Sequence, residues 1–117
     1  MVEAAAGGAN GTGVVARFAG TLLARLENGS YAAEKAGWVQ CRDVAVARRC
    51  ALLWAQDANL INCLYVLGVN ETGRELGGAY YEGARPWIEL QIAKGGYRLG
   101  AWLNAVAGAV AGGGGEL

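Results

Sequence analysis

Few side chains in this sequence belong to the types that carry enzymatic chemistry. It contains no histidine, which is the commonest general base and the commonest metal ligand in proteins. Ser30 is the only serine, and no histidine is available to activate its hydroxyl group as a nucleophile. We therefore predict that the chain carries no catalytic residue and no metal ligand of its own.

Two further patterns only superficially suggest a site. Glu71 with Glu75, and Glu82 with Glu89, are carboxylate pairs, but such pairs act as acid and base only when they share a pocket, and most are solvated helix faces. The glycine-rich stretch 7–13 lacks the preceding strand and the Gly-Lys-Ser/Thr ending of a phosphate-binding loop. Neither pattern predicts a site.

A small basic cluster offers two interpretations. Arg42, Arg48 and Arg49 lie close in sequence to Trp38 and Trp54, a combination that can pair with a phosphate and stack on a base. The alternative is an exposed face of surface salt bridges. Ten basic and ten acidic residues give a formal net charge of zero, so the chain has no overall basic field that would attract nucleic acid. The charge balance favours the salt-bridge interpretation.

The three cysteines are Cys41, Cys50 and Cys63, and their spacing matches no zinc motif. In an oxidising compartment one of them must stay free or pair outside this sequence. In the cytosol all three are expected to be buried thiols. The sequence also contains glycosylation sequons, which matter only if the protein is secreted; they begin at Asn10, Asn28 and Asn70.

Nothing in the sequence predicts a membrane protein. Its most apolar run, residues 50–69, is interrupted by polar residues, so we expect no transmembrane segment. The first residues lack the basic and then apolar arrangement of a signal peptide. A hydrophobic content of 54% is sufficient for a folded core.

The chain divides by composition into three parts. Residues 1–13 and 108–117 are rich in alanine and glycine without periodicity, and we predict a flexible leader and a flexible tail. Residues 14–107 carry apolar residues at helical spacing, and no stretch alternates with a period of two. The predicted class is therefore all-α, with an array of about four helices.

Turn and capping residues predict where these helices lie. The first should end at Asn28-Gly29, and Ser30 should cap a short second helix that Gly37 ends. Asp43 is the expected N-cap of a third helix, the longest uninterrupted one. Pro86 should begin or kink the last helix, which runs to about Ala107.

Each of the two long helices carries a predicted apolar face. On the third, Asp57 and Asn59 closely follow Trp54, a residue of that face. A polar residue so placed is usually solvated or hydrogen-bonded locally, and a buried contact with another helix is the alternative. On the last, Gly95-Gly96 interrupts the stripe and predicts the close approach of another helix. The stripes consist of Val46, Cys50, Trp54, Ala58, Ile61 and Tyr65, and of Ile88, Ile92, Leu99, Leu103 and Val106.

The order of landmarks resembles the C-terminal part of the zinc-dependent, single-strand-specific nucleases of fungi and plants (the S-one/P-one nuclease family). The resemblance covers residues 15–107, and its most specific piece is Ile88–Leu99. The other matching pieces are Thr21–Leu23, Leu26–Tyr31, Gly37–Trp38, Trp54–Asn59, Cys63, Gly78–Tyr81 and Trp102–Asn104.

The resemblance implies a mainly α-helical, secreted fold with disulfides and glycosylation. Family members hydrolyse phosphodiester bonds in single-stranded DNA and RNA and remove 3′-phosphates from nucleotides, using three zinc ions. Their zinc ligands lie upstream of the matching region, so the resemblance transfers no ligand position to this chain. We therefore expect no zinc and no nuclease activity for the chain alone.

The resemblance also bears on the cysteines. Cys63 matches a family cysteine whose disulfide partner lies earlier in the full-length chain. Cys41 and Cys50 lie in a variable stretch, where they either pair with each other or stay free. Two interpretations of the whole chain remain open: a fragment of a nuclease without its zinc-binding half, or a non-catalytic helical packing or binding module derived from that family.

Overall fold

The structure is a computed structural model that describes residues 9–68, 73 and 75–112. Within these ranges every regular element is helical, which confirms the predicted all-α class. The chain divides into two compact units, the first ending at Lys35 and the second beginning at Ala36. No helix in the described ranges is long and apolar enough to cross a membrane.

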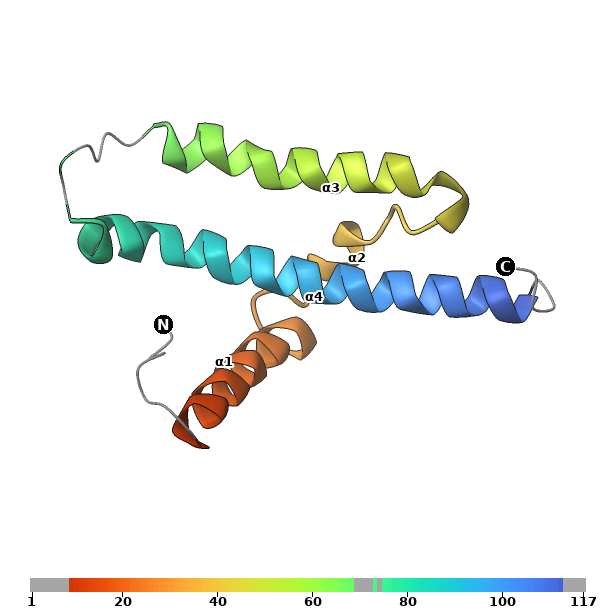
Figure 1. Ribbon diagram of the computed structural model, residues 1–117, viewed down its shortest axis with the longest axis horizontal. Coiled ribbons are helices and arrows are strands. Elements are labelled where there is room, and N and C mark those ends of the chain that lie inside the picture. The colour runs from red at the N-terminus through yellow and green to blue at the C-terminus, as the bar shows by residue number, and fades with distance from the viewer. Residues whose placement is uncertain (1–8, 69–72, 74, 113–117) are drawn as a thin grey trace. The chain divides into compact units, whose positions relative to one another are not determined.

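The first unit contains helix α1, Ala9–Glu27 (Figure 1). The helix begins inside the stretch predicted to be a flexible leader, and residues 1–8 of that stretch lie outside the described ranges. Its end is close to the predicted one, where the amide of Asn28 donates to the carbonyl of Ala24 at 3.0 Å. Its last turn carries Arg25, whose positive charge is favourable at a helix C-terminus.

The prediction of a short helix from Ser30 to Ala36 is wrong. Residues 28–34 form successive turns, and the short helix α2 spans Lys35–Trp38, so that Gly37 lies within it instead of ending it. The turns are held by the aromatic ring of Tyr31, over which the guanidinium group of Arg25 lies at 5.8 Å. Backbone hydrogen bonds also close these turns, among them that from the Tyr31 amide to the carbonyl of Arg25 at 3.0 Å.

The second unit begins with an ordered connector into the first long helix. The Asp43 carboxylate accepts a hydrogen bond from the Ala45 amide at 2.9 Å, which confirms Asp43 as an N-cap. It caps the 3₁₀ turn η1, Val44–Val46, which leads directly into α3, Ala47–Ile61. A disulfide joins Cys41 to Cys50, with 5.3 Å between their Cα atoms, and ties the connector to α3.

The two long helices form an antiparallel hairpin (Figure 1). The π-type turn η2, Asn62–Val66, continues α3, and a second such turn, η3, Leu76–Tyr80, precedes α4, Tyr81–Gly112. Tyr65 of η2 contacts Tyr80 of η3 at one end of the hairpin, and Trp54 in the middle of α3 contacts Trp102 in the later part of α4, as an antiparallel arrangement requires. α4 is longer than α3, which corrects the prediction that the third helix is the longest, and it extends into the predicted flexible tail, of which residues 113–117 lie outside the described ranges.

The face of α4 that meets α3 is not the predicted one. Ile92, Leu99 and Leu103 are 47%, 59% and 58% exposed, although the apolar stripe predicted them to be core. Lys94 and Trp102 contact α3 instead. Helical spacing defines both stripes equally well, so the partner helix decides which one is turned inward.

On α3 the prediction is partly confirmed. Cys50 is fully buried, and Trp54 and Tyr65 contact the aromatic rings of η3 and α4. Three further apolar side chains of this segment are exposed; they are Leu53, Leu60 and Leu64. The described second unit therefore carries apolar surface on the outer sides of both helices.

The glycine pair Gly95-Gly96 does not mark a close helix approach. A Cβ atom built on either residue would meet no atom within 4 Å among the described residues, and both residues are exposed. Close approach occurs at Gly83 instead, where a Cβ atom would overlap the Tyr65 hydroxyl group. That hydroxyl group donates to the carbonyl oxygen of Tyr80 at 2.7 Å.

Replacing these glycines should therefore have opposite effects. Gly95→Ala and Gly96→Ala should each raise the free energy of unfolding by about 0.5–1 kcal/mol, because alanine is favoured over glycine within a helix and finds open space here. Gly83→Ala should lower it by about 1–3 kcal/mol, because the ring of Tyr65 must move. Urea unfolding followed by circular dichroism measures both changes, and a loss of stability in the Gly95 and Gly96 variants would contradict the open environment.

Candidate functional site: an ion-pair network beside a basic pocket

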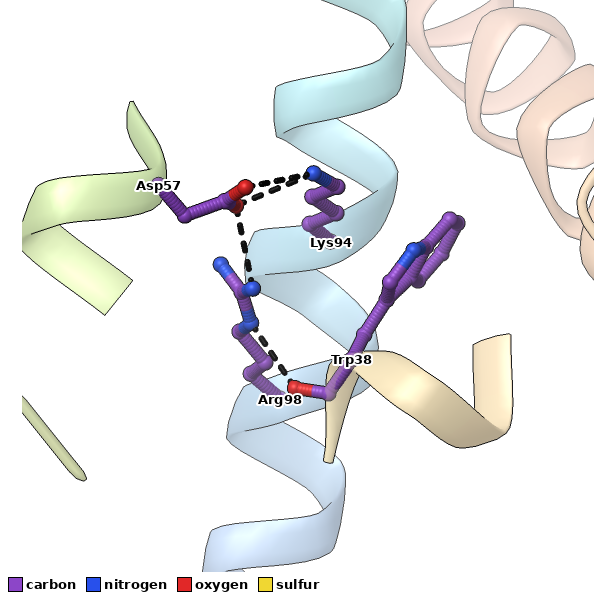
Figure 2. Close-up of polar contacts among 4 residues, drawn as sticks. All are labelled: Trp38, Asp57, Lys94 and Arg98. Atoms are coloured by element: carbon purple, nitrogen blue, oxygen red, sulfur yellow. Dashed lines mark hydrogen bonds and ion pairs between the residues drawn. The ribbon is translucent and has the colours of Figure 1, made fainter. Parts of the chain in front are cut away.

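The polar centre of the hairpin is the carboxylate of Asp57 (Figure 2). The ammonium group of Lys94 donates to both of its oxygens, at 3.1 Å to Oδ1 and 2.9 Å to Oδ2. The Nη2 atom of Arg98 donates to Oδ2 at 3.1 Å. Of the two environments considered for Asp57, the structure shows the contact with another helix.

Helical geometry places these groups together. Lys94 and Arg98 are four residues apart on α4, so they lie on one face, one turn from each other. The Nε atom of Arg98 also donates to the carbonyl oxygen of Trp38 at 3.0 Å. Figure 2 shows how this arginine links the end of α2 to both long helices. One network therefore joins three segments of the second unit.

Aromatic rings cover the cations of this network. The Lys94 ammonium group lies 5.8 Å from the ring centroid of Trp38, and the Arg98 guanidinium group lies 5.5 Å from that of Trp54. Trp54 in turn meets Trp102 edge to face at 5.9 Å. These rings exclude water from one side of each ion pair and hold the long side chains of both cations in place.

The ion pairs are partly shielded from solvent. The side chains of Lys94 and Arg98 are 11% and 13% exposed, and that of Asp57 is 33% exposed. Partial burial acts to raise the pKa of the Asp57 carboxyl group, but the hydrogen bonds and positive charges of Lys94 and Arg98 outweigh it. The pKa of Asp57 therefore lies below its ordinary value, and the group stays ionised at neutral pH.

A pocket of about 540 Å³ lies next to this network. Four cationic side chains and two carboxylates line it, so two positive charges are in excess; the six are Arg42, Arg49, Lys94, Arg98, Asp43 and Asp57. Trp38 and Trp54 form part of its apolar wall. The pocket brings together most of the predicted basic cluster, but Arg48 is not among its lining residues.

The sequence did not predict the roles of Lys94 and Arg98. Their spacing of four residues was visible, and so was the acidic residue on the apolar face of the third helix. What was missing was the pairing of the helices, because only an antiparallel hairpin brings Asp57 opposite these cations. A Lys-x-x-x-Arg pair on one helix, together with an acidic residue on the apolar face of another, is the signal that would have indicated the contact.

Apart from Cys41 and Cys50, which form the disulfide, the other predicted site residues are not brought together. Cys63 is unpaired and exposed, and Asn28 is exposed in the turn after α1. Asn10 lies within α1, and Asn70 lies outside the described ranges. Among the carboxylates considered, Glu89 pairs with Arg85 at 3.7 Å, and Glu75 accepts from the Gly77 amide at 2.8 Å. In the described part of the chain, no three metal-ligating side chains are grouped so that they could hold a metal ion.

The network should contribute measurably to stability. Asp57→Asn should lower the free energy of unfolding by about 1–3 kcal/mol, because it leaves Lys94 and Arg98 close together without a counter-charge. Arg85→Gln is the matched control, since it removes a half-exposed cation from a single long pair of 3.7 Å between residues four apart on one helix and should cost about 0.5 kcal/mol or less. Equal losses in the two variants, measured by urea unfolding, would contradict a structural role for Asp57.

The lowered pKa of Asp57 also predicts a dependence on pH. Its contribution to stability is fully present above the ordinary aspartate pKa of about 4 and is lost as the pH falls through the lower pKa of the folded state. As the pH falls below about 4, the free energy of unfolding should therefore decrease more steeply in the parent protein than in the Asp57→Asn variant. Thermal unfolding over a series of acidic buffers measures this difference, and parallel pH profiles would refute it.

Sequence comparison shows which known proteins this chain is similar to. The sequence model of the S1/P1 nuclease family matches residues 3–108. Nuclease PA3 of a Penicillium species and nuclease P1 of Penicillium citrinum are each 37% identical over 94 residues, which cover 78% of this chain and 35% of the relative. Nuclease S1 of Aspergillus oryzae is 38% identical over 112 residues, covering 92% of this chain and 38% of the relative.

The chain spans little more than a third of the length of these relatives. No solved structure matches it. The family match nevertheless extends over most of the sequence and includes the whole network around Asp57, with its partners Lys94 and Arg98. On this basis, the chain belongs to the S1/P1 nuclease family.

Proposed function

We propose that this chain is the helical scaffold segment of a zinc-dependent endonuclease, corresponding to the C-terminal part of the family fold. The complete enzyme would hydrolyse phosphodiester bonds in single-stranded DNA and RNA and remove 3′-phosphates from nucleotides. Family membership supports the nuclease class, and the coverage of little more than a third of each relative supports a segment of a larger domain.

The observation that carries this proposal is the apolar surface on the outer sides of the hairpin. Four leucines are each more than half exposed; they are Leu60 of α3, Leu64 of η2, and Leu99 and Leu103 of α4. Folded proteins rarely leave such apolar surface uncovered unless another segment or a partner packs on it. The remaining part of a complete nuclease domain would supply that covering segment.

The chain's own residues do not fit a zinc cluster. The sequence has no histidine, and no group of three ligating side chains occurs within the described ranges. Zinc would therefore be held by the other part of a complete enzyme, and no step of hydrolysis is assigned to a residue of this chain. The role proposed for this chain is to support that part through the Asp57 network.

The cysteines support a secreted protein. The disulfide between Cys41 and Cys50 is of the kind that persists in oxidising compartments. Cys63 is exposed, so it is accessible to a cysteine in another part of a complete enzyme. In a secreted protein the exposed Asn28 would also be available for glycosylation.

A second function class is a non-catalytic packing or binding module. It is favoured by the Asp57 network, which holds the hairpin together with contacts from this chain alone. The genomic sequence upstream of Met1 distinguishes the two. An adjoining reading frame rich in histidine, with His-x-x-x-Asp motifs, supports the nuclease segment, whereas a promoter directly upstream supports the module.

The chain alone should not degrade single-stranded DNA. Incubation with added zinc at mildly acidic pH should release no acid-soluble nucleotides, because the chain has no histidine ligands for the metal. Nuclease P1 under the same conditions is the positive control. Degradation that a chelator abolishes and zinc restores would overturn the assignment of this chain as a scaffold without catalytic residues.

A further inference from the structure

The pocket beside the Asp57 network contains two arginines that the network does not use. Arg42, on the connector before η1, and Arg49, in the first turn of α3, both line it. Neither forms an ion pair with any residue in the described ranges. Both side chains are exposed, as the salt-bridge interpretation expected, but they have no ion-pair partner among the described residues.

Among the described residues, the carboxylates of the pocket form no ion pair with these arginines, and their two negative charges are already subtracted in the excess of two. Asp57 is held by Lys94 and Arg98, and Asp43 accepts the hydrogen bond that caps η1. Arg49 also lies at the beginning of α3, where a positive charge interacts unfavourably with the helix dipole. Helix stability therefore does not explain why an arginine occupies this position.

We propose that this pocket binds a phosphate group carried by a nucleotide, with the guanidinium groups of Arg42 and Arg49 as its ligands. The planar guanidinium group donates two parallel hydrogen bonds to phosphate oxygens. The two excess positive charges of the pocket match the roughly twofold negative charge of a phosphate monoester at neutral pH. Lys94 and Arg98 remain bound to Asp57 and contribute only to the local positive potential.

The size and walls of the pocket suit a ligand larger than phosphate alone. Its volume of about 540 Å³ lies within the usual range of small-molecule sites. The indole ring of Trp54 forms part of the wall, although Arg98 occupies one of its faces and Trp102 contacts it edge to face. The choice of a nucleotide as the carrier rests on the proposed function, whereas the anion site rests on the charge and shape of the pocket.

The connector gives the site a fixed framework. The disulfide to the fully buried Cys50 anchors Cys41, which directly precedes Arg42. Arg49 directly precedes Cys50 on α3. Both phosphate ligands are thus adjacent to the same disulfide, which limits how far they can separate and reduces the entropy lost when they converge on one anion.

The test is a titration of the parent chain with inorganic phosphate, with deoxythymidine 5′-monophosphate and with oligothymidylate, followed by calorimetry and tryptophan fluorescence. The double variant Arg42→Gln/Arg49→Gln should bind the nucleotide at least about tenfold more weakly, because it loses the charged hydrogen bonds. Arg48→Gln is the matched control. It removes the same charge from the neighbouring position, which does not line the pocket, and should leave the affinity within about twofold.

Each outcome decides the proposal. Nucleotide binding that depends on Arg42 and Arg49 but not on Arg48 supports it, and tighter binding of oligothymidylate identifies the phosphodiester backbone as the source of the phosphate. Equal weakening by Arg48→Gln, or no binding by the parent chain, overturns the site. Binding of inorganic phosphate alone overturns the nucleotide as the carrier. These titrations need neither zinc nor hydrolysis, so they test the binding site independently of the proposed nuclease function. A complete enzyme that binds nucleotide at this pocket but does not cleave nucleic acid would contradict the nuclease function and leave the binding site in place.

Discussion

The ionised carboxylate of Asp57 is the constraint on which the second unit of this protein depends. It stands between two cations one helical turn apart on α4, and those cations would otherwise repel each other across a partly dry interface. An ion pair of this kind has a demanding geometry, because a shift of the helices by one residue would turn the cations away from the carboxylate. The network therefore sets the register of the antiparallel hairpin, and the aromatic contacts on either side of it fit that register.

The polar contact between the helices, formed by Asp57, Lys94 and Arg98, affects which residues lie on their outer surfaces. The face of α4 directed at α3 carries Lys94 and Arg98, so the apolar stripe through Leu99 and Leu103 is directed elsewhere. This distribution is unusual for an isolated helical hairpin, which buries its most apolar faces. It is understandable for a segment of a larger nuclease domain, where the outer stripe meets other helices. The ion pairs of Asp57 then fix how the two helices face each other, and hydrophobic packing with the remainder of the domain stabilises the hairpin.

Much of the fold could be predicted from local sequence. The all-α class follows from helical spacing, and the N-cap at Asp43 follows from a short side chain that accepts a backbone hydrogen bond. The short helix near Ser30 was misplaced because a local capping preference is weak against other contacts, here the local one between Arg25 and Tyr31 and the tertiary one between Trp38 and Tyr97. The Gly95-Gly96 pair was misinterpreted for a related reason. A glycine within a helix indicates either the close approach of another segment or an exposed position where the lack of a side chain has little effect. Only the surrounding atoms distinguish the two cases.

The sequence by itself determined the helical class, the absence of histidine ligands and the family resemblance, since each of these depends on residue types and their spacing along the chain. Only the tertiary structure decided which stripe of α4 turns inward and which arginines of the basic cluster share a pocket. Helical periodicity defines several faces of comparable amphipathicity, and local sequence does not rank them. Which face turns inward is decided by a complementary charge on the partner helix. Here that charge is the carboxylate of Asp57.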